Sequence, residues 1–444
     1  MTTPNQPFAY NPLRLAIALA ATTLLLAGCG GGNSGSDSDD NDDHEEIDST
    51  GRLATYDADA GALKVFEVDD GTLQETIPLT GSAPRLSHSP GYRYAVVIQR
   101  EDDLVSFMDG GLYVEDHGDH MHEYAETPTI LSLTLNDRRP THYSLSEDSG
   151  VVFFDGEDGV ASSKVTALSD ASLMGSTTLA SLGLDNAMHG VAKLIGDQLF
   201  VTYRDPSITG TTLPAEVERY SFDGDSFSFE TRYTEPCPLL HGAGANDHVL
   251  AFGCSDGVLV IDLHDDTYPA SKLDNPDSLA ADSRIGTIAA HHGVEELVGI
   301  AGDQLYVIDA EASADPYQEL SVGADTGRVA QGFDAHGEVF YVLGDDGDLR
   351  LFHPGDDWAL AHTITVTGAL GEDDAAPSIT ASAADDRLYV LDPNTSTITE
   401  IDSHDGEIIR TLDLDFEASG LVWLGLADQD HSHDDDDHDH DHDH

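Results

Sequence analysis

The sequence predicts an all-β protein built as a single β-propeller, and two observations lead to this fold class. Short apolar strands alternate with turns rich in Asp and Gly, and no helical periodicity accompanies them. A segment that starts at Arg52 also aligns without gaps with one that starts at Arg387, and six similar units lie between them. The resulting repeat of about 48 residues is typical of four-stranded propeller blades. We therefore predict eight blades, with seven as the alternative because the second and fourth units carry insertions.

The two ends of this repeat region predict how the ring closes. The unit at Arg52 begins directly at its second strand, whereas residues 420–427 supply one apolar strand more than the last unit needs. Adding that strand to the first blade would leave no free sheet edge. Residues 51–427 are therefore expected to form the propeller.

The first 28 residues are predicted to be a lipoprotein signal peptide. Arg14 precedes an apolar run from Leu15 to Leu26, and Ala27-Gly28 then lead into Cys29. This order is typical of the bacterial lipobox, in which the cysteine becomes the acylated N-terminus. An ordinary signal peptide is the alternative. Gly30 after Cys29 favours an anchor in the outer membrane that faces the periplasm.

Two polar segments flank the predicted propeller. Residues 29–50 are acidic and rich in Gly and Ser, so we expect a disordered tether. Residues 428–444 alternate Asp with His and cannot pack as a core. Six histidines in this tail, alternating with aspartate, are suited to weak and exchangeable metal binding, namely His431, His433, His438, His440, His442 and His444.

The net charge of the chain limits the classes of molecule that it can bind. There are 84 acidic residues against 19 basic ones, which gives a formal net charge of −65. Such a field repels nucleic acid and attracts cations. Most of these carboxylates are interpreted as a solvated acidic surface.

Two cysteines remain once Cys29 is assigned to the lipid. Cys237 and Cys254 lie symmetrically about the turn-like residues 244–247, so a hairpin would bring them face to face. In an oxidising compartment this arrangement predicts a disulfide.

Histidine recurs just before the apolar strand in six of the eight units. In a propeller that position is the innermost strand or the loop entering it, so these imidazoles would converge on the ring axis and could bind a divalent transition metal. The alternative is that they only satisfy backbone groups at tight turns. We expect two or three to bind metal out of His88, His142, His189, His241, His291, His292 and His336.

A second candidate site lies in the insertion of the second unit. His117, His120 and His122 follow one another with an odd and then an even spacing, so one strand cannot present all three on one face. A loop could fold them toward one ion, together with Asp116 and Asp119. Imidazole and carboxylate ligands suit zinc, although copper(II) and nickel would also bind them.

Motifs of the common hydrolases and nucleotide-binding proteins are missing. The sequence has no G-x-S-x-G elbow, no P-loop, no dinucleotide fingerprint after a strand, and no remaining cysteine to act as a nucleophile. We therefore do not expect an enzyme.

The sequence resembles the AztD-type periplasmic zinc metallochaperones, which are β-propellers associated with zinc ABC importers. The resemblance rests on the stretch GGLYVEDHGDHMH from Gly110, the His-Gly turns, and the segments around Cys237 and Cys254. It covers about residues 51–427. It implies a metal role for His117, His120 and His122, with Asp119 beside them. The predicted lipobox and the histidine tail are departures from the family.

The expected function is therefore capture of Zn²⁺ in the periplasm and its delivery to the solute-binding protein of a zinc ABC importer. The chain is expected to be a monomer that meets the membrane only through its lipid. A metal-dependent propeller hydrolase or lactonase and a cell-envelope interaction scaffold are the alternatives. A zinc store or sensor would have the same sequence features.

Overall fold

The computed structural model describes Ile47 and residues 49–117, 121–280, 282–312, 314–324 and 326–428, all within one compact unit. The predicted signal peptide, Cys29, nearly all of the tether, Asp119, His120 and the tail histidines lie outside the described residues. No helix within these ranges has the length and apolar character to cross a bilayer.

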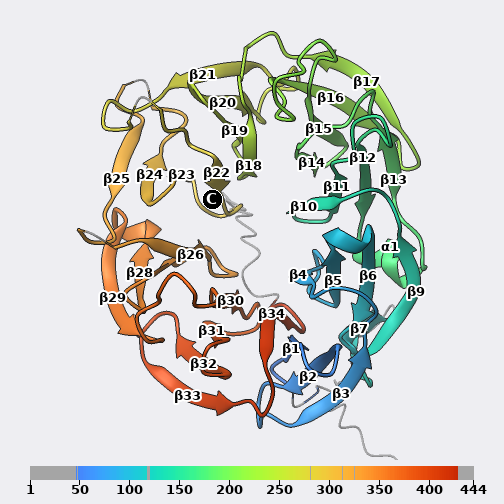
Figure 1. The fold of residues 1–444 in the computed structure, drawn as a ribbon, viewed down its shortest axis with the longest axis vertical. Helices are drawn as coiled ribbons and strands as arrows, with labels where there is room; N and C mark the ends of the chain where they lie inside the picture. Colours follow the sequence, from blue (N-terminus) through green and yellow to red (C-terminus); the bar gives the residue numbers. More distant parts are fainter. Residues whose placement is uncertain are drawn as a thin grey trace, which may run out of the picture. The chain divides into compact units, whose positions relative to one another are not determined.

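Eight four-stranded antiparallel sheets follow one another around a ring, as predicted (Figure 1). Five blades have simple connections, and their strands run from the ring axis outward in chain order. The first two of these blades are β14 (Ala192–Ile195), β15 (Gln198–Tyr203), β16 (Glu216–Phe222) and β17 (Phe227–Arg232), followed by β18 (His241–Ala245), β19 (Val249–Cys254), β20 (Gly257–Asp262) and β21 (Ala270–Asp274). The next two are β22 (Thr287–Ala289), β23 (Leu297–Ala301), β24 (Gln304–Ile308) and β25 (Tyr317–Leu320), followed by β26 (Arg328–Phe333), β27 (Phe340–Gly344), β28 (Asp348–His353) and β29 (Ala359–Thr365), with a 3-10 turn at Pro354–Asp356. The fifth is β30 (Ser378–Ala381), β31 (Arg387–Asp392), β32 (Thr397–Asp402) and β33 (Ile408–Asp413).

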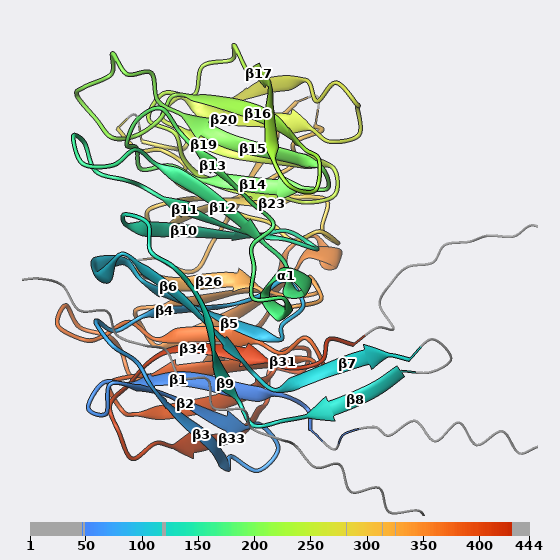
Figure 2. The same cartoon turned by 90° about the vertical axis from the view of Figure 1, so that its right-hand side faces the viewer.

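Two blades carry additions between their outer strands. The blade β10 (Pro140–Leu145), β11 (Gly150–Phe154), β12 (Lys164–Leu168) and β13 (Ala180–Gly183) contains the short helix α1 (Asp170–Met174). The blade β4 (Arg85–His88), β5 (Tyr94–Gln99), β6 (Leu104–Asp109) and β9 (Thr129–Leu135) has a 3-10 turn at Arg100–Asp102 and the hairpin β7 (Leu112–Asp116) and β8 (Met121–Ala125). Figure 2 shows this hairpin extending beyond the blades at one end of the ring.

The first blade is completed by the last strand of the chain. Its order is β3 (Leu73–Pro78), β2 (Ala62–Glu67), β1 (Arg52–Asp57) and β34 (Ala418–Leu424), with β34 nearest the axis. β34 pairs antiparallel with β1, from Arg52 opposite Leu424 to Asp57 opposite Ala418. The predicted closure is therefore confirmed, and the aligned repeats at Arg52 and Arg387 both fall on the second strand from the axis.

The hydrophobic core lies between neighbouring blades. The second strand of each blade is buried along almost its whole length, because each of its faces packs against another sheet. Val191, Phe200 and Val217 of one blade, for example, pack against Leu250 and Phe252 of the next. Burial of apolar surface contributes about 25 cal/mol of stabilisation per Å², and this burial between neighbouring sheets holds the ring together.

Each inner strand begins at one end of the ring and finishes at the other, and the two ends carry different residues. We call the end at which inner strands begin the strand-entry end; it includes residues 184–191 before β14 and 233–240 before β18. The opposite end, which we call the hairpin end, includes residues 89–93 after β4, residues 246–248 after β18, and the hairpin β7–β8.

The disulfide between Cys237 and Cys254 is present, with a Cα–Cα distance of 4.9 Å. Cys254 ends β19, but Cys237 lies in the connection before β18 instead of facing Cys254 from a paired strand, because the ladder starts at His241 opposite Gly253. The bond therefore fixes the connection that leads into His241.

The end of the predicted tether is attached to the propeller. The backbone N–H of Ile47 donates to Glu123 Oε2 at 2.8 Å, and Thr50 bonds through its N–H and its hydroxyl to Asp69. At the other boundary, the N–H of Asp428 donates to the carbonyl of Ala383 at 2.8 Å.

Replacing Trp423 by alanine tests the closure. The Trp423 side chain is fully buried among Leu53, Tyr389 and Leu421, and its backbone N–H donates to Thr380 Oγ1 of β30. We expect Trp423→Ala to lower the free energy of unfolding by about 3–5 kcal/mol, as for other buried aromatic truncations. Denaturant unfolding measures it. Phe229→Ala, at a position 56% exposed on β17, is the control and should have little effect; equal effects of both changes would contradict the account.

Candidate metal centre

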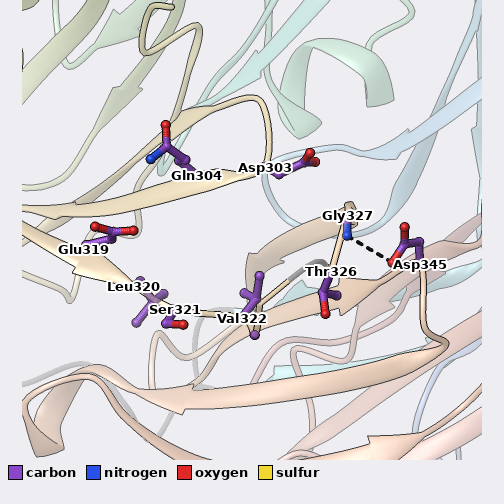
Figure 3. A pocket seen from close by; sticks show the side chains of 10 residues that line it. Asp303, Gln304, Glu319, Leu320, Ser321, Val322, Thr326, Gly327 and Asp345 are labelled. Carbon is purple, nitrogen blue, oxygen red and sulfur yellow. Dashed lines mark hydrogen bonds between the residues drawn. The ribbon is translucent and has the colours of Figure 1, made fainter. Parts of the chain in front are cut away.

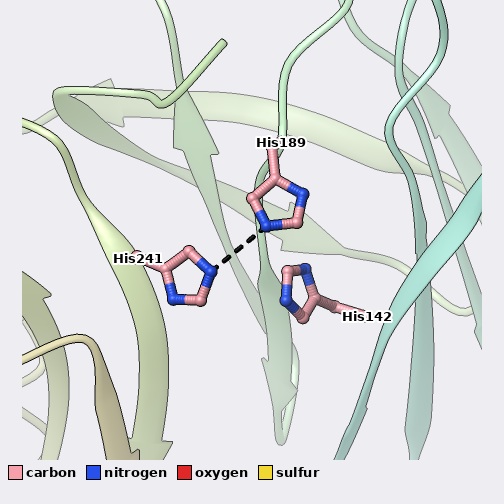
Figure 4. Close-up of side chains that lie close together, drawn as sticks. All are labelled: His142, His189 and His241. Atoms are coloured by element: carbon pink, nitrogen blue, oxygen red, sulfur yellow. Dashed lines mark hydrogen bonds between the residues drawn. The ribbon is translucent and has the colours of Figure 1, made fainter. Parts of the chain in front are cut away.

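Three histidines from consecutive blades meet at the strand-entry end. His142 is near the start of β10, His189 lies just before β14, and His241 begins β18. Their ring centroids are 4.7, 5.1 and 5.6 Å apart, and the Nε2 atoms of His189 and His241 are separated by 3.1 Å. Figure 4 shows the three imidazoles pointing toward one another. Each can offer one nitrogen so that the three atoms lie within 4.8 Å of one another.

The Nδ1 atom of each imidazole is held by an acceptor. His142 Nδ1 donates to the carbonyl of Gly190 at 2.8 Å, and His241 Nδ1 donates to the carbonyl of Gly286 at 2.6 Å. His189 Nδ1 donates to Asp155 Oδ2 at 2.9 Å. Because these partners can only accept, the proton of each neutral ring belongs on Nδ1 and the lone pair on Nε2. All three rings thus present an unprotonated Nε2.

Glycine at the His-Gly turns permits this close packing of blades. Gly242 has φ of +74°, and a Cβ there would lie 2.6 Å from the carbonyl oxygen of Gly286, which is the acceptor for His241. A Cβ on Gly190 would lie 2.4 Å from Thr202 Oγ1. The glycines therefore let the neighbouring blade come within hydrogen-bonding distance of the imidazoles.

Burial favours the neutral form of two of these imidazoles. It lowers the pKa of His142 to about 4, and His189 beside it adds to that shift. Burial also lowers the pKa of His241. Two nitrogen lone pairs 3.1 Å apart repel each other unless a proton or a cation lies between them. In a tetrahedral zinc site, nitrogens at about 2.0–2.1 Å from the ion are about 3.3 Å apart, so the spacing suits a divalent transition metal.

Asp155 supports the site from behind and was missed by the sequence analysis. Its side chain is buried, and Oδ2 receives the bond from His189 and a second from Arg100 Nη2 at 3.3 Å. A carboxylate that holds the far nitrogen of a histidine is the usual second partner in zinc sites. Asp155 directly follows the apolar strand β11, and no sequence signal separates it from the many other Asp residues that follow strands.

The other repeat histidines do not join this site. His88, His291, His292 and His336 lie at or after the ends of inner strands, at the hairpin end. The expectation that all six units place histidine at one position is therefore wrong: "before the apolar strand" covers both ends of the innermost strand, because that strand is only three to seven residues long.

Two of these residues have clear structural roles. His88 stacks on Tyr92 at 4.2 Å between centroids, and its Nδ1 donates to the carbonyl of Ser89. His291 Nε2 donates to the carbonyl of Ala335, and its Nδ1 accepts from the N–H of Gly293. His292 lies 4.3 Å from His291 between centroids.

The insertion of the second blade contains a hairpin. The predicted loop over Asp116 to His122 is only partly wrong: Asp116 ends β7 and His122 belongs to β8, while residues 118–120 lie outside the described residues. Residues 112–116 pair with residues 121–125, with Glu115 opposite His122 and Tyr113 stacked on Tyr124 at 5.0 Å. The alternation of side chains along β7 and β8 explains the pairing. His117 and His122 are 5.0 Å apart between ring centroids, and His117 Nε2 is 3.7 Å from Glu115 Oε2. Asp116 belongs to β7, and a metal role for this hairpin remains a prediction.

A pocket of about 560 Å³ lies away from the histidines. Figure 3 shows Asp303, Glu319 and Asp345 along it, and Asp345 Oδ1 accepts the N–H of Gly327 at 3.0 Å. No imidazole lines this pocket.

Fold and geometry together define an eight-bladed β-propeller with a three-imidazole site suited to a divalent transition metal. Comparison with known proteins then shows that the chain is similar to one particular protein. The chain is 25% identical over 359 residues to the zinc chaperone AztD of Citrobacter koseri, across 79% of this chain and 81% of that protein. The resemblance to AztD proteins is confirmed. No family model matches the chain.

Solved structures support the fold. Two structures of Citrobacter koseri AztD, one of them of the apo protein, match with TM-scores of 0.71 and 0.70 at 22% identity, over 84% of this chain and 97% of theirs. Dihydro-heme d1 dehydrogenase NirN matches with a TM-score of 0.56 at 12% identity, over 85% of this chain and 75% of that one.

The depressed pKa values predict metal binding that resists acid. Protons compete for ligand nitrogens only below their pKa, so three ordinary imidazoles would lose about tenfold each, or about a thousandfold in total, between pH 7.5 and 5.5. With the pKa of His142 at about 4 and that of His241 lowered, we expect a loss of less than about a hundredfold. Competition titration against a chelator, corrected for the chelator's own protonation, measures the affinity. A full thousandfold loss would show that the rings titrate as exposed ones.

Asp155→Asn tests the support of His189. The substitution keeps the shape of the side chain but removes the charge that favours the His189 tautomer, so zinc affinity should fall about tenfold or more. Asp158→Asn is the matched control, because Asp158 is an exposed carboxylate that pairs with Arg204. Zinc affinity is measured by competition titration. An unchanged affinity in Asp155→Asn would remove Asp155 from the site.

Proposed function

We propose that this protein is a zinc metallochaperone of the periplasm, which captures Zn²⁺ with His142, His189 and His241. The observation that carries the proposal is the convergence of three Nε2 atoms, each on a ring whose Nδ1 is already held. Similarity to a protein named zinc chaperone AztD supports zinc as the cargo.

The site has the features of one that releases its ion. Three imidazoles leave one position of a tetrahedral zinc open, whereas structural zinc sites are closed by four protein ligands. The three imidazoles are half-buried and lie at the strand-entry end of the propeller. A ligand from another protein can therefore enter the open position, and the histidines can be displaced one after another.

The cellular setting is part of the proposal. The lipobox at Cys29 supports a lipid anchor, which we place in the outer membrane with the propeller in the periplasm, and the protein is proposed to act as a monomer. The receiver in this proposal is the solute-binding protein of a zinc ABC importer. A net charge of −65 raises the local concentration of cations around the protein.

The hairpin and the tail are proposed to collect zinc before it reaches the propeller site. His117 and His122 are close enough to share an ion, and Asp119 and His120 lie between them in the sequence. The alternating Asp and His of residues 431–444 offer many weak sites. Weak sites exchange quickly, which suits collection better than storage.

Replacing the three histidines tests the proposal. His142→Ala, His189→Ala and His241→Ala combined should abolish the tightest zinc site in competition titration of the full-length chain, while the weak tail sites remain. The matched control changes His353, His362 and His404, which lie on outer parts of two blades, and should bind like the parent.

Transfer and turnover distinguish the possible functions. Zinc-loaded parent protein should pass zinc to a periplasmic zinc-binding protein faster than free diffusion through a chelator allows. Zinc-dependent hydrolysis of a lactone would instead favour an enzyme. Tight binding that is equal in parent and triple variant would refute the proposed site.

A further inference from the structure

A second group of metal-type ligands lies at the hairpin end, away from the site already described. It consists of His248, His264 and Glu311, whose ligand atoms lie within 4.8 Å of one another. His248 Nδ1 and His264 Nε2 are 2.7 Å apart, and the ring centroids are 4.8 Å apart. His248 is seven residues after His241, beyond the far end of β18, which is about 20 Å along an extended chain.

Two neighbouring blades supply these three residues. His248 follows β18, His264 follows β20, and Glu311 follows β24 of the next blade. Each occupies the same place in a turn, because its backbone N–H donates to an Asn or Asp side chain two residues before it. The N–H of His248 donates to Asn246 Oδ1 at 3.0 Å, that of His264 donates to Asp262 Oδ1 at 2.8 Å, and that of Glu311 donates to Asp309 Oδ1 at 3.0 Å.

Asn246 also ties the two blades together. Its Nδ2 donates to the carbonyls of Val294 and Glu295, which precede β23 in the next blade. Asn246 is buried, although it is polar. The backbone under all three side chains is therefore fixed by the blade-to-blade contact, and only the side-chain torsions need to adjust when a ligand enters.

The charges favour a cation between these groups. In the described part of the chain, Glu311 forms no ion pair with Lys or Arg, and it faces two imidazoles in a protein with a large excess of carboxylates. A direct hydrogen bond between the two imidazoles uses one proton and leaves the carboxylate without a positive partner. A divalent ion would satisfy all three groups at once.

We propose that His248, His264 and Glu311 form a second site for a divalent transition metal, for which Zn²⁺ is the probe. Two imidazole nitrogens and one carboxylate oxygen match the ligands and the number that zinc takes in open sites. The nitrogens move from 2.7 Å to about 3.3 Å apart when the ion enters, a change that half-buried and exposed side chains make by rotation. This site does not depend on the proposed function of the first.

The site is more exposed than the three-histidine site and includes a carboxylate ligand. His264 and Glu311 are exposed and His248 is half-buried, whereas all three histidines of the first site are half-buried. Weaker binding and faster exchange follow from exposure and from the more easily replaced oxygen ligand. The propeller would then bind zinc at both ends of its inner strands.

Zinc retention by variants of the full-length protein tests the second site. The bound zinc is counted by atomic absorption in samples held at equilibrium with a weak chelator that buffers free Zn²⁺, because the site is expected to exchange its ion quickly. His248→Ala combined with His264→Ala should retain one zinc ion fewer than the parent, and Glu311→Gln should weaken that site about tenfold or more. His353→Ala combined with His404→Ala is the matched control, since these rings are 6.2 Å apart between centroids and form no three-ligand group among the residues that the structure describes.

The two sites are separated by combining variants. The variant that combines all five substitutions should lose the ion lost in the His248/His264 variant and also the ion lost in the His142/His189/His241 variant. The two proposed sites can therefore be confirmed or refuted independently of each other. Unchanged thermal unfolding of the metal-free variant shows that the fold is intact. If the His248/His264 variant retains as many zinc ions as the parent, the pair is only a hydrogen bond between two imidazoles and the second site is refuted.

Discussion

Pairing of the last strand with the first is the constraint on which the rest of the structure depends. β34 enters the first blade beside β1, and this closure fixes the number of blades and the angle between them. Once the angle is fixed, the starts of three consecutive inner strands lie close enough for their side chains to meet near the axis. The candidate metal centre is thus a consequence of closure as much as of its own residues.

The chemistry of the centre comes from contacts between blades. His142 and His241 each donate to a carbonyl in the following blade, and His189 donates back to Asp155 of the preceding one. Each of the three imidazoles is therefore oriented by a neighbouring blade, and these bonds leave Nε2 as the nitrogen that faces the other two rings. Burial between blades lowers the pKa of His142 and His241 and keeps the nitrogens available. A single isolated blade could not provide any of this.

Much of the fold follows from the sequence, because the repeat from Arg52 to Arg387 and the extra strand at residues 420–427 carry the blade number and the closure. His142, His189 and His241 could be selected as candidates, but not separated from His88 or His291. Which end of an inner strand a histidine occupies depends on a shift of a few residues in strand boundaries. Asp155 and the group around His248 were not anticipated, since both arise from contacts between residues distant in sequence. A loop was predicted around His117 to His122 because the odd and then even histidine spacing does not fit one strand face, whereas the pairing of Tyr113 with Tyr124 across β7 and β8 has no signal in that spacing.

The most direct test of the central claim is zinc-edge anomalous diffraction from crystals of the protein loaded with one equivalent of Zn²⁺. The account predicts the strongest anomalous peak within about 2.0–2.1 Å of the Nε2 atoms of His142, His189 and His241. The strongest peak elsewhere, with these three imidazoles bonded only to protein, would contradict the assignment of the metal centre.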